Sequence, residues 1–262
     1  MSSAHNGSAK RYGPHDKVNI LGTELNAITF REARGILDQV VRDHSARIFR
    51  AVNVYTVMLG YDDPSFQTII NQADFVLPDG MPLVWVSRWM GYTGVERVHG
   101  DDFMLASIAD NPEWKHFLIG GRIGQGRKVI KTLKDRFPRI QILGAHETPQ
   151  RPLLDRESDA LLEEIVTSNP DILWVGMGTP YQDYWMQRNK EHIDCPMFGV
   201  GSSFDILAGY TRPTPAWIKQ VGLQWMFRLV QEPRRLFWRY FFYNPRFIFA
   251  ILRQLSGTAR HG

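Results

Sequence analysis

The chain of 262 residues contains a single cysteine, Cys195. One cysteine excludes an internal disulfide framework and a zinc cluster held by cysteines. Its neighbours in "IDCPMF" are those of a buried strand, so we interpret Cys195 as a structural thiol rather than a nucleophile. A chain so poor in cysteine is compatible with a reducing compartment.

Long apolar runs are also missing. No segment reaches the roughly 18 consecutive apolar residues of a membrane-spanning helix, so we expect no such helix. The start, "MSSAHNGSAKRYGPHD", lacks the apolar core of a secretory signal and predicts a disordered tail over residues 1–16. The whole chain is 44% hydrophobic and 22% charged, which is the composition of a globular protein with a sizeable core.

Common metal and nucleophile motifs are absent from the sequence. It has no Asp-x-Asp pair, so a carboxylate-bound metal that holds a diphosphate is not indicated. The histidines at positions 44, 99, 116, 146 and 192 have no metal-ligand spacing, and "GSSF" lacks the G-x-S-x-G frame. We therefore expect no metal and no cofactor. A leaving diphosphate would be stabilised by arginines and helix N-termini instead.

Acidic residues are scarce in the last fifth of the chain. Residues 212–262 hold 9 of the 31 Lys and Arg but 1 of the 27 acids, Glu232, which gives this segment a charge of +8. Residues 1–211 keep the other 22 basic and 26 acidic side chains and carry −4. Such a basic segment indicates an anionic partner, which could be phosphate, nucleic acid or lipid headgroups.

Strand-like and helix-like segments alternate through the body of the chain. "RIFRAVN", "DFVLPDG", "KHFLIGG", "RIQILGA", "DILWVGMG" and "PMFGVGSS" predict short strands. Helical periodicity separates them, as in "TFREARGILDQVVRDH", where Thr29 is the expected N-cap. The alternation predicts an α/β domain over residues 17–211, with a Rossmann-like, mostly parallel sheet of at least six strands and helices on both faces. Sites in such folds lie at the carboxyl ends of the strands.

The composition changes after Thr211, where "RPTPAW" predicts a hinge. The segment that follows is dense in aromatic residues and arginine. It predicts two or three short helices, broken at Pro233 and Pro245, that form a C-terminal appendage over residues 212–262.

The appendage has two interpretations. It packs on the body with solvated arginines, or it attaches to a membrane. In the second case, aromatic side chains such as Trp225 and Trp238 enter the lipid interface, and arginines such as Arg239 meet anionic headgroups.

Glycines follow several predicted strands. Gly80 ends "DFVLPDG", Gly178 closes "VGMG", Gly201 stands in "VGSS", and "LIGGRIGQG" holds four more. These turns leave backbone N–H groups free for a phosphate, so their repetition favours a nucleotide or another phosphorylated ligand. In a rival interpretation, "GGRIGQG" belongs to a dinucleotide fold with Glu147 as the ribose acid, although the spacing departs from G-x-G-x-x-G.

Asp79 is the least expected residue in its surroundings, because it ends an apolar strand between two turn-formers. A carboxylate in such a place is costly unless the protein uses it. It can act as an N-cap for the helix beginning at "MPLVW". In "VERVHGDDFM", Arg97 and His99 precede Gly100, and Asp101 begins a helix. That cluster again permits either capping or function.

Several of these motifs occur together in one order. "NVYTVMLGYDDPSFQTIINQADFVLPDGMPLVW", "ERVHGDDFM", "VGMGTPYQD", "GVGSSFDILAG" and "LQWMFRLVQEPRRLFWRY" follow one another from about residue 18 to residue 240. In this order the chain resembles the WecG/TagA/CpsF family, glycosyltransferase family 26. The resemblance is specific because it rests on the whole set of motifs rather than on a single one.

The resemblance implies an inverting glycosyltransferase. Such an enzyme moves a hexose or N-acetylhexosamine from a UDP-sugar to a polyprenyl-diphosphate-linked sugar, without a metal, as a peripheral protein on the cytoplasmic face of the inner membrane. The products serve cell-wall or exopolysaccharide synthesis. The expected partners are the UDP-sugar donor, the lipid-linked acceptor and an anionic membrane surface, with no nucleic acid. The oligomeric state stays open, a homo-oligomer included.

The resemblance also implies roles for particular residues. Asp79 takes the position of the general base in the "PDG" motif, which an inverting transfer needs beside the acceptor hydroxyl. Arg228 and Arg235 fit the tail arginines that close over the site and hold diphosphate. Other positions match substrate-binding motif positions: Asn53, Arg97, Gly100, Gln182, Phe204 and Asp205.

Three positions depart from the family pattern. Ala51 replaces a common threonine, Asp183 replaces a common glutamate, and Gln224 replaces a common glutamate. The first change lies near the reacting sugar and leaves the donor open between N-acetylmannosamine, its uronic acid and glucose.

Two other function classes stay open on the residues alone. The glycine-rich turns permit a nucleotide-dependent oxidoreductase. The basic aromatic appendage permits a nucleic-acid-binding module, since arginine and aromatic side chains also suit single strands.

Overall fold

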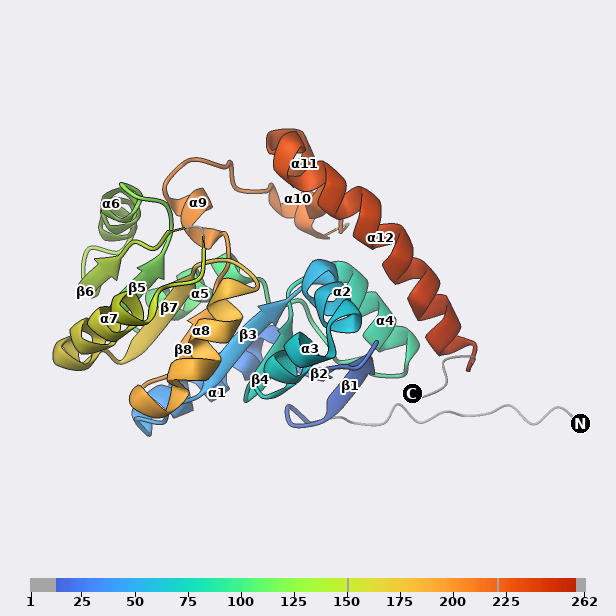
Figure 1. Ribbon diagram of the computed structural model, residues 1–262, viewed down its shortest axis with the longest axis horizontal. Coiled ribbons are helices and arrows are strands. Elements are labelled where there is room, and N and C mark those ends of the chain that lie inside the picture. The colour runs from blue at the N-terminus through green and yellow to red at the C-terminus, as the bar shows by residue number, and fades with distance from the viewer. Residues whose placement is uncertain (1–12, 150, 221, 258–262) are drawn as a thin grey trace, which may run out of the picture.

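The computed structural model describes residues 13–149, 151–220 and 222–257. The predicted disordered tail falls mostly outside this part, because residues 1–12 are not described. Figure 1 shows an α/β body with the last helices lying across one side of it.

One sheet of six strands, all parallel, forms the centre of the body. The strand order is β4-β3-β8-β7-β5-β6. The strands are β3 (Ile48–Val52), β4 (Phe75–Pro78), β5 (Lys115–Gly120), β6 (Gln141–His146), β7 (Ile172–Gly176) and β8 (Met197–Gly199). A separate antiparallel hairpin joins β1 (Lys17–Ile20) and β2 (Thr23–Asn26). The prediction of a Rossmann-like sheet with at least six strands is confirmed.

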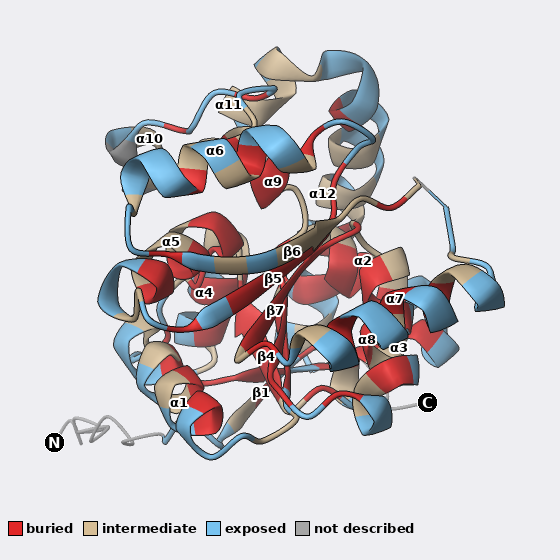
Figure 2. Ribbon diagram, turned by 90° about the vertical axis from the view of Figure 1, so that its left-hand side faces the viewer, coloured by how far each residue is buried: buried red, intermediate tan, exposed pale blue. Residues whose placement is uncertain are grey.

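Helices cover both faces of this sheet. The body helices are α1 (Phe30–Arg42), α2 (Val54–Asp62), α3 (Pro64–Asn71), α4 (Met81–Trp89), α5 (Gly100–Asp110), α6 (Gly126–Arg136), α7 (Asp155–Ser168), α8 (Tyr181–Asn189), the 3-10 turn η1 (Lys190–His192) and α9 (Ser203–Leu207). Alternate strand residues point to opposite faces. In β7, Leu173 and Val175 pack with α7 and α8, whereas Ile172 and Trp174 pack with α1, α5 and α6. Five of the strands are accordingly buried along most of their length, whereas the edge strand β6 is partly exposed (Figure 2).

Local signals in the sequence explain where several helices begin. Thr29 caps α1, as predicted, in a capping box with Glu32, since each side chain accepts the other residue's backbone N–H. Asn53 caps α2 by accepting the N–H groups of Tyr55 and Thr56. Gly80, rather than Asp79, is the N-cap residue of α4.

The last three helices are α10 (Ala216–Gln220), α11 (Gln224–Gln231) and α12 (Pro233–Leu255). The predicted break at Pro233 is confirmed, because α11 ends just before it. The predicted break at Pro245 is wrong, because Pro245 lies inside α12. Buried contacts on both sides of Pro245, from Leu236 and Phe247, hold the helix on the body despite the lost backbone hydrogen bond.

The α12 helix packs along α2 and reaches the β1–β2 hairpin (Figure 1). Arg246 forms two hydrogen bonds with the Asp62 carboxylate, of 2.6 and 2.8 Å, and Gln254 bonds the backbone of Asn19 and Leu21. The boundary predicted at residue 211 falls in the irregular segment between α9 and α10. Among the described residues, no helix has both the length and the apolar content needed to cross a bilayer.

Candidate active site

A cavity of about 1000 Å³ opens at the carboxyl ends of β3, β4, β7 and β8, and α4, α11 and α12 form its outer wall. Most of the residues that the sequence singled out line this cavity. They are Asn53, Asp79, Gly80, Arg97, Gly178, Gln182, Gly201, Trp225, Arg228, Arg235 and Arg239. The cavity therefore combines residues of the α/β body with residues of the C-terminal appendage.

Asp79 lies where β4 ends, and its backbone N–H continues the ladder by donating to the Val52 carbonyl. Its side chain does not cap α4. One carboxylate oxygen accepts the backbone N–H of Gly100 at 3.3 Å, and the other accepts the amide of Asn53 at 3.4 Å. The carboxylate is thus held by two donors while it faces the cavity, which is the arrangement that a positioned base requires.

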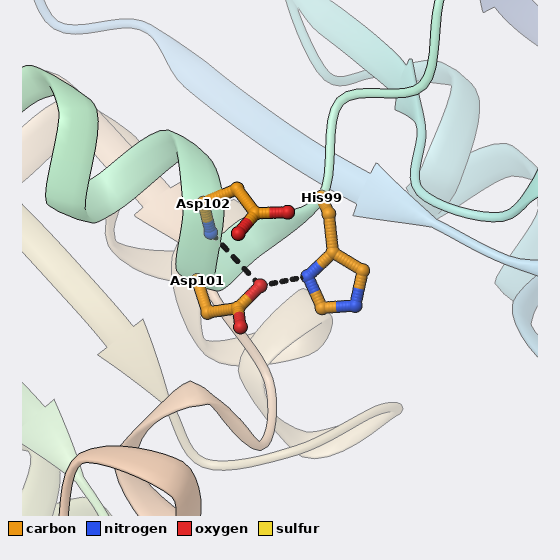
Figure 3. Close-up of side chains that lie close together, drawn as sticks. All are labelled: His99, Asp101 and Asp102. Carbon is orange, nitrogen blue, oxygen red and sulfur yellow. Dashed lines mark hydrogen bonds and ion pairs between the residues drawn. The ribbon is translucent and has the colours of Figure 1, made fainter. Parts of the chain in front are cut away.

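His99 is the main residue that the sequence reasoning missed. It is buried at the start of α5, and its Nδ1 contacts the Asp101 carboxylate (Figure 3). The same Nδ1 lies 3.8 Å from Asp79 Oδ1. Burial disfavours the charged imidazole, but the two carboxylates outweigh it and raise the pKa of His99. Burial likewise opposes ionisation of Asp101, whereas His99 and Lys219 hold its pKa well below the usual range.

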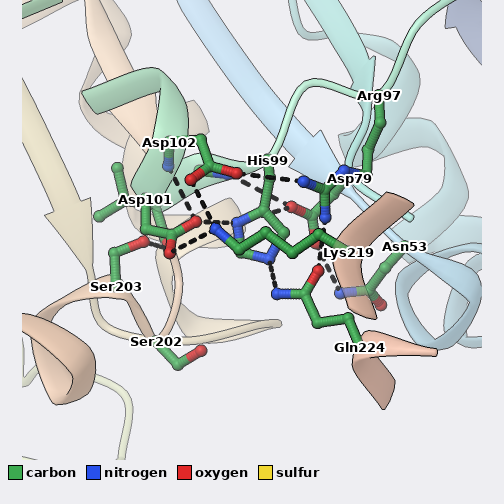
Figure 4. Close-up of polar contacts among 12 residues, drawn as sticks. Asn53, Asp79, Arg97, His99, Asp101, Asp102, Ser202, Ser203, Lys219 and Gln224 are labelled. Carbon is green, nitrogen blue, oxygen red and sulfur yellow. Dashed lines mark hydrogen bonds and ion pairs between the residues drawn. The ribbon is translucent and has the colours of Figure 1, made fainter. Parts of the chain in front are cut away.

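The appendage reaches this cluster through polar side chains (Figure 4). Gln224 at the start of α11 accepts a hydrogen bond from Arg97, and its Nε2 lies 2.6 Å from His99 Nε2. Lys219 of α10 lies 2.6 Å from one oxygen of Asp102, and Arg97 lies 3.1 Å from the other. With the Gln224 amide nitrogen toward His99, the imidazole accepts at Nε2 and carries its proton on Nδ1.

His99, Asp101 and Asp102 are the group among the described residues that comes closest to a metal site, with ligand atoms within 4.8 Å of one another. Their charges are already matched, however. Lys219 contacts both carboxylates, and Arg97 contacts Asp102. A divalent cation would meet the Lys219 ammonium at the same oxygens, so these residues do not fit a metal in this arrangement.

Three arginines of the appendage line the cavity. Arg228 donates to the Ser202 hydroxyl at 2.6 Å, and Arg235 pairs with Glu232. Arg239 lies over the Tyr55 ring, 3.5 Å from its centroid, and no carboxylate among the described residues pairs with it. Burial lowers the pKa of Arg239 to about 10. The cavity therefore has an excess of positive charge that can receive an anion.

Comparison with known proteins agrees with this geometry. A family model described as the WecG/TagA/CpsF family of glycosyl transferases matches residues 18–261. The chain belongs to this family. It is therefore a glycosyltransferase, and the resemblance inferred from the motifs is confirmed.

Three relatives share one name, N-acetylglucosaminyldiphosphoundecaprenol N-acetyl-beta-D-mannosaminyltransferase. The Bacillus spizizenii protein is 28% identical over 253 residues, or 94% of this chain and 93% of the relative. The Bacillus subtilis protein is 24% identical over 79% of each chain. A Staphylococcus aureus protein is 24% identical over 84% of this chain and 87% of the relative. The similarity thus extends over most of the glycosyltransferase.

The glycine-rich turns of the glycosyltransferase all lie at the carboxyl edge of the sheet, but they do not all serve one cavity. Gly178 and Gly201 line it, whereas "LIGGRIGQG" does not. There, the Glu147 carboxylate accepts the N–H groups of Gly124 and Gly126, each at 2.6 Å. The expectation that the turns line one edge of the sheet holds, but this turn offers no free Gly124 or Gly126 donor to a phosphate, because the Glu147 carboxylate accepts both. The same contacts leave Glu147 without the ribose-binding role of the dinucleotide interpretation.

Five predicted residues lie beside the cavity rather than on its wall: Gly100, Asp101, Phe204, Asp205 and Trp238. Gly100 donates its backbone N–H to Asp79, and Asp101 contacts His99, so both hold residues that line the cavity. Phe204 is buried against Gly176, where an added Cβ would lie 2.6 Å from its ring. Asp205 accepts a hydrogen bond from Gln125 and faces Arg122 at 3.5 Å.

A buried ion pair supports the neighbouring turn. Arg50 of β3 and Asp183 of α8 are both buried, with 3.7 Å between Nη1 and Oδ1, and Arg50 also donates to the Asp183 carbonyl at 2.9 Å. Burial lowers the pKa of Arg50 and raises that of Asp183, and each charge counters the effect on the other. The adjacent Gln182 accepts the Gly178 N–H at 3.2 Å, which fixes the turn after β7.

Proposed function

We propose that the protein transfers a sugar from a UDP-sugar to a polyprenyl-diphosphate-linked sugar, with inversion at the anomeric carbon. The observation that carries this proposal is the cavity itself. It combines a carboxylate held by two donors, Asp79, with three arginines that come from a separate part of the chain. The family membership and the names of the relatives support the same reaction.

The proposed step is a single displacement. The acceptor hydroxyl gives its proton to the Asp79 carboxylate while its oxygen forms a bond to the anomeric carbon of the donor. The bond from that carbon to the β-phosphate oxygen breaks, and the electron pair leaves with UDP. Arg97 also lines the cavity, but its guanidinium is engaged by Gln224 and Asp102. Asp79 thus keeps a free edge toward the acceptor.

We assign the anionic groups of the substrates to the appendage. Arg228 and Arg239 face the cavity, and neither forms a close, direct ion pair like that of Arg235 with Glu232. Arginine suits diphosphate because its planar group donates two parallel hydrogen bonds. In this role the appendage contributes residues to the active site, while residues 17–211 form the catalytic α/β domain.

The proposal also concerns which sugar the UDP donor carries. The names of the three relatives make UDP-N-acetylmannosamine the first donor to test, and N-acetylglucosaminyl diphosphate the first acceptor headgroup. Ala51 leaves a methyl group on the cavity wall, where a threonine hydroxyl could bond a sugar. UDP-glucose and the uronic acid of N-acetylmannosamine are therefore the necessary comparisons.

We also propose that the protein attaches to the cytoplasmic face of the membrane through the outer face of α12. Trp238 and Phe242 are exposed there, at 72% and 53%, and Trp238 lies off the cavity. Exposed aromatic side chains beside arginines are typical of a helix that lies in the lipid interface. A lipid-linked acceptor would be reached from the same position.

The decisive experiment is a donor screen. Purified protein is incubated with each UDP-sugar and a lipid-linked N-acetylglucosaminyl diphosphate, and released UDP and the disaccharide product are measured. We expect acceptor-dependent UDP release with one donor strongly preferred. If no UDP-sugar yields a disaccharide while the protein stays folded, the proposed reaction is wrong.

A further inference from the structure

The cavity that contains Asp79 extends well beyond the polar cluster. Its wall follows α12 from Arg235 to Leu252. At 1.5 Å per residue, this part of the helix is about 25 Å long. In the proposed reaction the acceptor's sugar and diphosphate lie at the polar end, beside Asp79, Arg228 and Arg239, which leaves the apolar part of the α12 wall without an assigned group.

The far part of the cavity is an apolar trough. We define it by Trp85 and Trp89 of α4 and by Phe241, Ile248 and Leu252 of α12, which line it from two sides. The three α12 residues are 7 and 4 positions apart and therefore lie on one face of the helix. None of the five is charged, and Trp89 and Phe241 are 73% and 65% exposed.

Local contacts keep charge out of the trough. Arg88 stands next to Trp89 in α4, but its guanidinium donates to the Val95 carbonyl at 3.0 and 3.2 Å and does not line the cavity. On α12, Arg246 is held by Asp62 on the α2 side. The guanidinium groups of Arg88 and Arg246 are thus bound away from the trough.

We propose that the trough holds the first isoprene units of the acceptor's polyprenyl chain. The inference rests on the proposed function, because it takes the lipid-linked diphosphate as the substrate. The chain is covalently attached to a diphosphate bound near Arg228 and Arg239, so it must leave the polar end of the cavity. The apolar trough is continuous with that end and offers a branched hydrocarbon an aromatic wall on α4 and a mixed aromatic and aliphatic wall on α12.

The trough differs from the outer face of α12. Trp238 and Phe249 are exposed on the same helix, yet neither lines the cavity. A bilayer contact would use such outward-facing side chains, whereas a bound chain needs the two-sided trough. The two roles can therefore be separated in an assay that contains no membrane.

The test compares two water-soluble acceptors in the absence of vesicles and of detergent micelles. Both carry N-acetylglucosaminyl diphosphate, one as its methyl ester and the other as its farnesyl ester. We expect the wild-type KM for the farnesyl acceptor to be at least about tenfold lower, since several apolar groups leave water on binding. Trp89→Ala and Phe241→Ala should raise the farnesyl KM toward the methyl value and leave the methyl KM unchanged.

Phe249→Ala is the matched control, because Phe249 is 64% exposed on α12 and has the same side chain as Phe241. It should change neither KM. Equal KM values for the two acceptors in the wild type would overturn the trough and leave the proposed function intact, since both acceptors would still turn over. If the wild type is a dimer and Trp89→Ala is a monomer in solution, with both KM values unchanged, the trough would instead be the contact surface for a second copy of the protein. Absence of turnover with either acceptor would remove the proposed function and this inference with it.

Discussion

Replacement of Asp79 by asparagine is the sharpest test of the proposed chemistry. The amide keeps the shape of the side chain and removes its basicity. A positioned base contributes about 10²–10⁴ in rate, so we expect kcat to fall by that factor, which corresponds to roughly 2.7–5.4 kcal/mol. UDP-sugar binding should remain, because the substitution leaves the arginines in place.

The structure also predicts the cost of this substitution to stability. Both Asp79 oxygens accept N–H groups, from Gly100 and Asn53, so an amide nitrogen must face one of these donors. Asn53 cannot turn its own oxygen toward it without losing its bonds to the N–H groups of Tyr55 and Thr56. One long hydrogen bond is lost, at a cost of about 1 kcal/mol.

Thr29→Ala separates stability from catalysis. It removes the cap of α1 at a residue that does not line the cavity, and it also costs about 1 kcal/mol. The assay measures single-turnover UDP release for both variants, with urea unfolding in parallel. We expect similar loss of stability in both and loss of rate in Asp79→Asn alone. An Asp79→Asn rate within a few-fold of the wild type would show that Asp79 does not remove the acceptor proton.

Two further predictions concern the site, and another concerns a buried histidine of the core. Gln224→Glu places a carboxylate against His99 Nε2 and should raise the pKa of His99 further. An NMR titration of the imidazole should show this increase. An unchanged titration curve would contradict the contact between residues 224 and 99. Burial lowers the pKa of His116 to about 4 from an ordinary 6.5. As the pH falls, the unfolded chain therefore takes up this proton before the folded protein does. The free energy of unfolding should decrease by about 3 kcal/mol between pH 6.5 and pH 4. Urea unfolding of His116→Gln, which cannot titrate, should lack this part of the pH dependence, and an identical slope in both proteins would refute it. Because Lys219 and Arg97 already match the carboxylates beside His99, turnover should be unaffected by a chelator, and activity lost with EDTA and restored by magnesium would disprove this.

The sheet and most of its helices could be predicted because each is encoded within a few residues. The six apolar segments became the six parallel strands, and Thr29 caps the helix that its sequence predicts. Pro233 ends one helix, as its chemistry requires locally. Pro245 follows the same local rule but lies inside α12, because distant contacts through Phe247 and Ile251 decide its conformation.

The site could be predicted in part for the same reason. Asp79 stands out by its position at the end of an apolar strand, and the family motifs add its neighbours. His99 has no such signal, because its importance comes from Gln224, which lies 125 residues further along the chain. Glu147 was singled out for a different role, since only the fold brings its carboxylate to the glycine N–H groups that a phosphate would otherwise take.

The buried pair of Arg50 and Asp183 has a consequence for how this sequence can diverge. Loss of either partner would leave a buried charge uncompensated, which typically costs about 3–5 kcal/mol, whereas replacement of both by apolar side chains can be neutral. Positions 50 and 183 should therefore covary among descendants of this chain and change together or not at all. A change in this pair would act on the start of α8, and with it on Gln182 at the cavity wall. Substitutions in the buried core could in this way change which substrate the enzyme accepts, although neither Arg50 nor Asp183 lines the cavity.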